Sequence, residues 1–178
     1  MNSKAKEVLS TSLYFLFVII VCFLVVKYVA QRTEVIGVSM METLHDGDNL
    51  IMNKISYRLG EPERFDIVIF PFRNDERKNY IKRIIGLPGE TIQIDDHGNI
   101  FINGELLEEH YGKDVIENPG RAAEPFVLGD DEYFVMGDNR NNSEDSRFYE
   151  VGPVHRDEIL GKVWIRIFPL NRFGKVDK

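Results

Sequence analysis

The chain has 178 residues, of which 43% are hydrophobic, enough for the core of one compact domain with a small appendage. Lys and Arg number 22 against 29 Asp and Glu, so the formal net charge is −7 and a nucleic-acid-binding surface is not expected. Cys22 is the only cysteine, which excludes an intramolecular disulfide and a metal site built on a cysteine pair. The composition leaves the oligomeric state open.

The N-terminal part of the chain predicts a membrane anchor. Residues 8–26 form a run of 19 residues without a charge, and a helix of about 20 apolar residues spans the hydrocarbon core of a bilayer. The alternative is a cleavable signal peptide, which has a shorter apolar core followed by small residues. Here the run ends in Val25-Val26-Lys27-Tyr28, which resembles an interfacial anchor. We therefore predict an uncleaved transmembrane helix over residues 8–28.

The charges around this helix give little information on its orientation. Lys4 and Lys6 lie on one side and Lys27 and Arg32 on the other, so the positive-inside bias is weak. We expect residues 1–7 to be a short cytoplasmic segment and the domain to lie outside the cell membrane, mainly because of the function inferred below.

Residues 29–178 predict a domain that is mainly β. Short runs rich in β-branched residues alternate with turn formers, and Asn103-Gly104 is a strong tight-turn signal. The predicted strands cover residues 35–38, 49–52, 66–70, 80–85, 91–95, 100–102, 133–136 and 162–168.

Three segments of this domain lack a strand pattern. Residues 105–127 are largely polar and predict an insertion or a long loop over the sheet. Residues 137–149 predict a polar loop, and residues 156–160 predict one helical turn. The anchor is thus the only long helix expected.

The histidines do not reveal a catalytic base. His97 lies in a turn and His110 in the polar insertion, which favours solvated roles. His45 and His155 each have an aspartate nearby in the sequence, so a Ser/His/Asp triad remains an alternative. The His-Glu-x-x-His motif of zinc proteases is absent, and we expect neither a metal nor a cofactor.

A lysine is the other possible base, provided that burial keeps it neutral. Lys82 lies in the predicted strand 80–85, but this pattern alone favours a solvent-facing lysine. Ser39 is a candidate nucleophile because it follows a predicted strand, and Gly37 allows a substrate backbone to approach closely. Taken alone, Ser39 would be an ordinary serine at the end of a strand.

Four segments together resemble type I signal peptidases, the leader peptidase family. Residues 37–44, Gly-Val-Ser-Met-Met-Glu-Thr-Leu, resemble the nucleophile motif of that family, and residues 64–70 resemble its next characteristic strand. Residues 80–90 resemble its lysine motif, and residues 137–147 resemble its last motif. The four occur in the family's order behind a single anchor, as in the Gram-positive bacterial branch.

The resemblance implies a role for each site residue. Ser39 would be the nucleophile, Lys82 the general base, and the hydroxyl of Ser143 would orient the Lys82 amine. The backbone N–H of Ser39 would be one oxyanion donor, whereas Gly37 stands where some members carry a second, serine donor. The loop that carries Ser143 would be braced by Asp138, Arg140, Asp145 and Arg147, for which a solvated charged turn is the alternative.

The resemblance also implies a fold, a reaction and partners. The domain would be an antiparallel β-sheet catalytic domain, and the enzyme a serine endopeptidase that removes signal peptides from exported preproteins at the bilayer surface. A preprotein would bind extended along a strand edge. Shallow apolar pockets would accept small residues at the −3 and −1 positions, in agreement with the Ala-x-Ala pattern of signal peptides.

Position 42 departs from the family pattern, which usually has proline there. Glu42 adds a negative charge three residues from Ser39, and this charge would weaken Lys82 as a base if the two were close. An impaired homologue that binds preproteins without cutting them is therefore an alternative. Two other functions are possible in principle. The first is a self-cleaving repressor, which the membrane anchor disfavours. The second is a non-enzymatic membrane-tethered β module, for which the four ordered motifs would be a coincidence.

Overall fold

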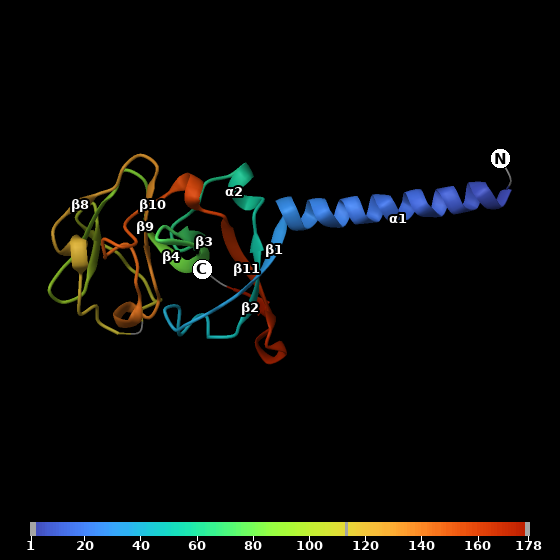
Figure 1. The fold of residues 1–178 in the computed structure, drawn as a ribbon. Coiled ribbons are helices and arrows are strands. Elements are labelled where there is room, and N and C mark those ends of the chain that lie inside the picture. The colour runs from blue at the N-terminus through green and yellow to red at the C-terminus, as the bar shows by residue number, and fades with distance from the viewer. Residues whose placement is uncertain (1–2, 113, 177–178) are drawn as a thin grey trace.

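The computed structural model describes residues 3–112 and 114–176, in which one long helix projects from a β-rich domain (Figure 1). The elements in chain order are α1 (Ser3–Tyr28), β1 (Ala30–Glu34), β2 (Asn49–Asn53), α2 (Ser56–Leu59), β3 (Ile67–Phe72), β4 (Asp75–Gly86), β5 (Thr91–Ile94), β6 (Ile100–Ile102), β7 (Glu105–Leu106), η1 (Gly120–Ala123), β8 (Phe126–Val127), β9 (Glu132–Met136), η2 (Arg140–Asn142), β10 (Val154–His155), η3 (Arg156–Glu158), β11 (Gly161–Phe168), η4 (Leu170–Arg172) and β12 (Gly174–Lys175).

Helix α1 contains the whole predicted anchor. Its Lys6–Tyr28 part is long and apolar enough to cross a membrane, and none of its most apolar stretch is buried against the rest of the protein. A helix that is apolar all round and lacks a protein partner is suited to lipid.

The larger sheet has eight strands, ordered β1-β2-β11-β3-β4-β9-β10, with β12 beside β11. Its strand pairs are all antiparallel, as predicted. Helix α1 leads almost directly into β1, which pairs with β2 from Ala30 opposite Asn53 to Glu34 opposite Asn49. The anchor is therefore joined to an edge strand of the sheet.

The smaller sheet has the order β7-β6-β5-β8 and lies at the end of the domain remote from α1 (Figure 1). Its isoleucines on β5 and β6 pack against Ile85, Phe134 and Met136 of the larger sheet. The predicted tight turn at Asn103-Gly104 joins β6 to β7, and both residues have positive φ. Within residues 105–127, β7 and β8 contribute to this sheet.

The first strand lies earlier than predicted. Residues 35–38 are irregular, and β1 instead covers Ala30–Glu34, whose sequence is mostly polar. A polar segment can form a strand here because β1 lies at the sheet edge, where only one side has to pair. Val35 is nevertheless buried, and its N–H donates to the carbonyl of Asp48 at 2.8 Å.

Candidate active site

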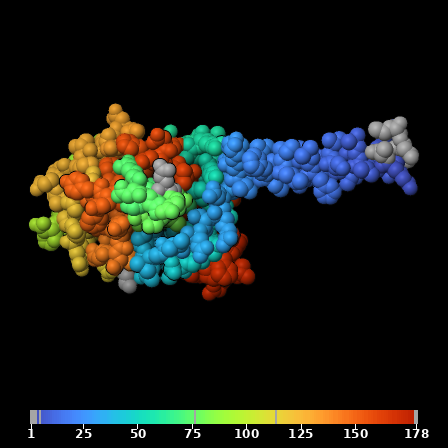
Figure 2. Space-filling view, in the orientation of Figure 1, coloured from blue at the N-terminus to red at the C-terminus, as the bar shows by residue number. Residues whose placement is uncertain are grey.

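A groove of about 640 Å³ runs between the end of β1 with the segment after it and the first half of β4. Residues 32–40 form one wall and residues 77–82 the other, and Asn142 and Glu144 contribute from the loop after β9. In Figure 2 these segments, coloured blue, green and orange, meet on the face of the domain turned toward the viewer. The groove thus joins parts of the chain that are about 100 residues apart.

Two predicted site residues meet in this groove. The Nζ atom of Lys82 lies 2.6 Å from the Oγ atom of Ser39. Ser39 is half-buried in a turn, whereas Lys82 lies on β4 opposite Val68 of β3. The distance is suitable for direct proton transfer between the two side chains.

Lys82 is buried, with only 3% of its surface exposed, so the alternative of a solvent-facing lysine is wrong. Burial lowers the pKa of Lys82 from its usual 10.5 to about 8, because the ammonium loses hydration. The carboxylates of Asp145 and Glu144 act in the opposite direction and raise the pKa, which limits the shift. The Tyr80 ring also lies beneath the amine, 5.2 Å from Nζ.

The loop that carries Ser143 reaches the backbone of Ser39. Asn139 N–H donates to the carbonyl of Ser39 at 3.0 Å. A methyl group added at Gly137 would lie 2.3 Å from Ser143 Oγ and 2.4 Å from the Ser39 carbonyl oxygen, so glycine is needed for this approach. Ser143 itself is buried, and its hydroxyl has no hydrogen-bond partner among the described residues. The predicted bond from Ser143 to Lys82 is thus not formed here.

Asp138 connects the nucleophile segment to the lysine strand. Its carboxylate accepts two hydrogen bonds from Arg83, at 2.9 and 2.8 Å, and one from the hydroxyl of Thr43 at 2.6 Å. Arg83 and Asp138 are both fully buried. Sequence reasoning missed Arg83, although its place between isoleucines on the strand face opposite Lys82 was a signal of burial.

The other predicted bracing residues form a buried network. Asp145 accepts hydrogen bonds from Arg147 Nε at 2.8 Å and from Gly137 N–H at 3.1 Å. Arg147 donates to the Arg140 carbonyl at 2.5 Å, and Arg140 pairs with Glu109 from the segment before β8. Because all four predicted charged residues are buried, the alternative of a solvated turn is wrong.

The backbone N–H groups of Ser39 and Gly37 differ in whether they are already engaged. The N–H of Ser39 donates no hydrogen bond within residues 3–112 and 114–176. The N–H of Gly37 is engaged, because it donates to a carboxylate oxygen of Asp46 at 2.7 Å. Gly37 also has a φ of +97°, a conformation that glycine adopts readily.

Neither the histidines nor Glu42 belong to this groove. Its described lining contains no histidine, and His155 instead lies 3.1 Å from Asp131. Glu42 is exposed and also lies outside the lining. The described residues include no group of three or more His, Cys, Asp or Glu that could hold a metal ion.

Comparisons with known proteins agree with these observations. A family model described as signal peptidase, peptidase S26, matches residues 8–168. A probable signal peptidase I-2 from Synechocystis is 42% identical over 152 residues, covering 83% of this chain and 67% of the relative. Signal peptidase I P from Bacillus subtilis subsp. natto is 38% identical over 168 residues, covering 88% of this chain and 87% of the relative.

A solved structure is also similar. The crystal structure of a signal peptidase I from Enterococcus faecalis has 32% sequence identity and a TM-score of 0.46, covering 58% of this chain and 97% of that chain. Since the relatives include cyanobacterial as well as Bacillus proteins, membership of the Gram-positive branch stays a prediction.

Proposed function

The chain belongs to the signal peptidase family, peptidase S26, and is a signal peptidase I-type serine endopeptidase; we propose that it uses Ser39 as nucleophile and Lys82 as general base. One observation carries this assignment: a buried lysine amine lies 2.6 Å from a serine hydroxyl in an open groove. A serine becomes a useful nucleophile only when an adjacent base removes its proton.

The lowered pKa makes Lys82 suitable for this role. With a pKa of about 8, about a tenth of the molecules hold a neutral amine at pH 7. At the usual value near 10.5, only about three in ten thousand would do so. Burial therefore increases the reactive population by more than two orders of magnitude.

The reaction then follows in two halves. The Oγ atom of Ser39 attacks the carbonyl carbon of the scissile bond while its proton moves to Nζ of Lys82. The oxyanion forms beside the Ser39 N–H, and the ammonium of Lys82 protonates the leaving amine. A water molecule, deprotonated by the same amine, next hydrolyses the acyl-enzyme and releases the signal peptide with a free carboxylate.

The supporting residues have positioning roles in this proposal. The hydroxyl of Ser143 would orient the Lys82 amine, since it is a buried hydroxyl on the loop that touches Ser39. A buried polar group without a partner is costly, which favours a function for it. The loop itself would be held by the buried Asp138, Arg140, Asp145 and Arg147. Gly37 lines the groove without a side chain, which would leave space for the substrate.

The groove offers an unpaired strand edge to an extended preprotein. The pairing of β4 with β9 begins at Arg83, so among the described strands residues 79–82 have no partner on that side. A peptide could add to this edge by main-chain hydrogen bonds, with its small −1 and −3 side chains in shallow pockets. The groove wall offers apolar side chains for such pockets: Val35, Ile36, Val38, Met40 and Ile81.

The anchor would place the reaction at the membrane. We propose that residues 1–7 are cytoplasmic, that residues 8–28 cross the bilayer, and that residues 29–178 act outside. The apolar helix supports the anchor, and preproteins reach the outer face only after export. Two partners held in one membrane meet at a high effective concentration.

Cleavage of a purified preprotein by the detergent-solubilised full chain tests the assignment. Ser39→Ala and Lys82→Ala should each lower the rate by about a thousandfold or more, as expected for members of one catalytic unit. Lys175→Ala, which removes an exposed lysine on β12, is the matched control and should cleave normally. Cleavage by the folded Lys82→Ala protein at the control rate would refute the proposed base.

The same experiment separates the impaired alternative. If the wild-type chain binds the preprotein, melts cooperatively and still fails to cut it, the chain would be a binding homologue. Intact Ser39–Lys82 geometry and the exposed position of Glu42 favour the active enzyme.

A further inference from the structure

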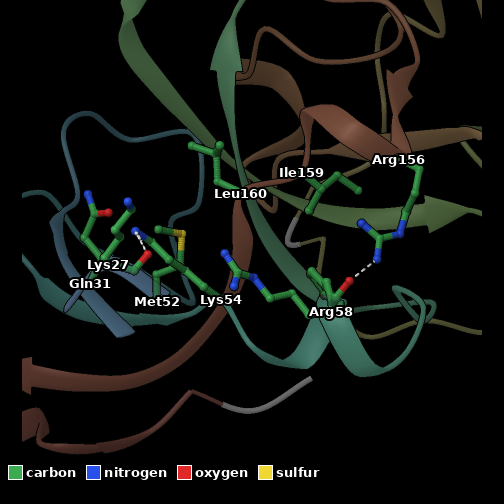
Figure 3. A pocket seen from close by; sticks show the side chains of 9 residues that line it. Lys27, Gln31, Met52, Lys54, Arg58, Arg156, Ile159 and Leu160 are labelled. Carbon is green, nitrogen blue, oxygen red and sulfur yellow. Dashed lines mark hydrogen bonds between the residues drawn. The ribbon is translucent and has the colours of Figure 1, made fainter. Parts of the chain in front are cut away.

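A second pocket lies where the anchor meets the domain, away from the catalytic groove. It has a volume of about 380 Å³ and is formed by the end of α1, by β1 and β2, by α2 and by the turn around η3 (Figure 3). Its lining consists of Lys27, Gln31, Met52, Lys54, Tyr57, Arg58, Arg156, Ile159 and Leu160.

The pocket concentrates positive charge in a protein that is acidic overall. Four of its lining residues are cationic, and only Arg156 is paired with a carboxylate among the described residues, that of Glu61 at 2.6 Å. In Figure 3 the guanidinium of Arg58 lies between the side chains of Lys54 and Arg156. Cations that line one pocket repel one another, so an anion bound in the pocket among them is stabilised.

The contacts fix this pocket at the end of the anchor. Lys54 N–H donates to the carbonyl of Val29 at 2.8 Å, and the Lys54 amine lies 3.5 Å from the carbonyl oxygen of Lys27. The Tyr28 ring lies 4.9 Å from the Arg58 guanidinium and 5.0 Å from the Lys27 amine. Tyrosine with basic residues at a helix end is typical of the headgroup region.

Apolar side chains flank the basic ones. Leu59 and Ile55 are 83% and 38% exposed, and both lie next to the pocket residues Arg58 and Lys54 in sequence. Exposed leucine and isoleucine beside cations suit a surface that meets both acyl chains and headgroups.

We propose that this pocket binds the phosphate of an anionic phospholipid headgroup. Arg58 offers a planar fork that matches phosphate oxygens, while Lys27 and Lys54 add point charges. Free phosphate shares this chemistry but would not use the apolar side chains next to the pocket. The inference rests on the proposed anchor, because only a membrane-spanning α1 brings headgroups to this level.

Lipid retention by the purified full chain tests the proposal. The detergent-solubilised protein is mixed with micelles containing phosphatidylglycerol or phosphatidylcholine, and retained lipid is counted by native mass spectrometry. Lys54→Gln/Arg58→Gln should weaken phosphatidylglycerol retention by about tenfold, since each cation near an anionic surface contributes appreciably. The matched control is Lys4→Gln/Lys6→Gln, which removes equal charge from the other end of α1.

The outcomes distinguish a pocket that binds the phospholipid from one that binds free phosphate and from nonspecific binding. Selective loss of phosphatidylglycerol in the pocket variant supports the site, whereas equal loss in both variants, or equal retention of the two lipids, overturns it. Displacement by millimolar inorganic phosphate, beyond that caused by chloride of equal ionic strength, would assign the pocket to free phosphate instead. Because bound lipid is counted and no peptide is cleaved, this result is independent of the Ser39–Lys82 proposal.

Discussion

At the scale of single residues, Lys82 combines two opposing effects. Burial keeps part of its amine neutral, which the proposed reaction needs. The same burial destabilises the folded state at any pH at which Lys82 is protonated in the unfolded chain, because folding then has to desolvate the ammonium or release its proton. Asp145 and Glu144 moderate this effect because their carboxylates stabilise the ammonium. The pKa of about 8 is the result of this balance.

The first prediction concerns the pH dependence of activity. Since the neutral amine is the proposed base, kcat/KM should rise with pH and reach half its maximum near pH 8. Glu144→Gln removes a carboxylate that raises the pKa of Lys82, so the midpoint should move to lower pH. Rates on a short peptide substrate measured from pH 5 to about 9.5 check both statements. A profile that stays flat across this range would contradict the role of Lys82.

The second prediction concerns stability. The folded pKa of Lys82 lies below the unfolded value of about 10.5, so between pH 8 and 10.5 the unfolded state binds more protons and stability rises with pH. Below pH 8 the full penalty applies, on the order of 3 kcal/mol at most. Lys82→Met should therefore be more stable than wild type at pH 7.

Thermal melts of both proteins at pH 7 and pH 10 measure this difference. The advantage of the methionine variant should shrink at the higher pH, because most of the wild-type penalty is lost by pH 10. An advantage that is the same at both pH values would show that packing, and not the charge of Lys82, is responsible.

The third prediction concerns Glu42. Its side chain is exposed and lies outside the groove, whereas Asp145 and Glu144 are the leading carboxylates that act on Lys82. Glu42→Pro should change kcat/KM by no more than about twofold, as is usual for exposed positions. A gain of tenfold or more in the same peptide assay would instead support the impaired homologue.

At the scale of elements, strand β4 organises the site. Its alternation sends Lys82 toward Ser39 and Arg83 toward Asp138, so one strand holds both the nucleophile segment and the Ser143 loop. Breaking the buried Arg83–Asp138 pair would leave a charge without a partner, which is more damaging than losing a surface ion pair.

The fourth prediction tests the close approach of the Ser143 loop. Gly137→Ala would place a methyl group 2.4 Å from the Ser39 carbonyl oxygen, so the loop has to move and activity should fall by about a hundredfold. Gly60→Ala is the matched control, since its added methyl group would meet only the Ser56 carbonyl at 3.6 Å. Wild-type rates in a folded Gly137→Ala protein would show that the loop position is unimportant for catalysis.

The same elements show how far sequence reasoning extends. The anchor and most strands could be predicted, because a long apolar run and period-2 patterns are local in the sequence. The meeting of Ser39 with Lys82 was expected only from the resemblance of the ordered motifs to type I signal peptidases, because the strand pattern alone favoured a solvent-facing lysine. Strand β1 was missed because an edge strand can be polar, and the pairing of β7 and β8 was missed because they are only two residues long. Gly137 was not identified as a site residue because its importance depends on a contact with Ser39, nearly 100 residues away.

At the scale of the whole molecule, the anchor and the catalytic domain are separable in packing. The most apolar stretch of α1 is not buried against the domain, and the three core clusters of the domain contain no residue of α1. The domain should therefore fold without the helix, provided that β1 is retained to pair with β2.

The fifth prediction follows from this separation. A chain that begins at Val29 should cleave a short soluble peptide at nearly the full rate, because the groove and the Ser39–Lys82 pair are unchanged. Cleavage of a preprotein embedded in vesicles should fall by about a hundredfold or more, since the anchor no longer raises the effective concentration. Comparing the two substrates under one set of conditions measures the effect, and equal losses on both would indicate damage to the domain.

In the proposed arrangement, the direct junction between α1 and β1 also limits how far above the bilayer cleavage can occur. Ser39 follows Tyr28 by 11 positions, and an extended chain covers at most about 3.6 Å per residue, so the nucleophile lies within about 40 Å of the helix end. A signal peptide whose apolar segment stays in the membrane must bring its scissile bond down into that layer. The 11 positions from Tyr28 to Ser39, which include the short strand β1, thereby set an upper bound on the spacer that a substrate needs between its membrane segment and its cleavage site.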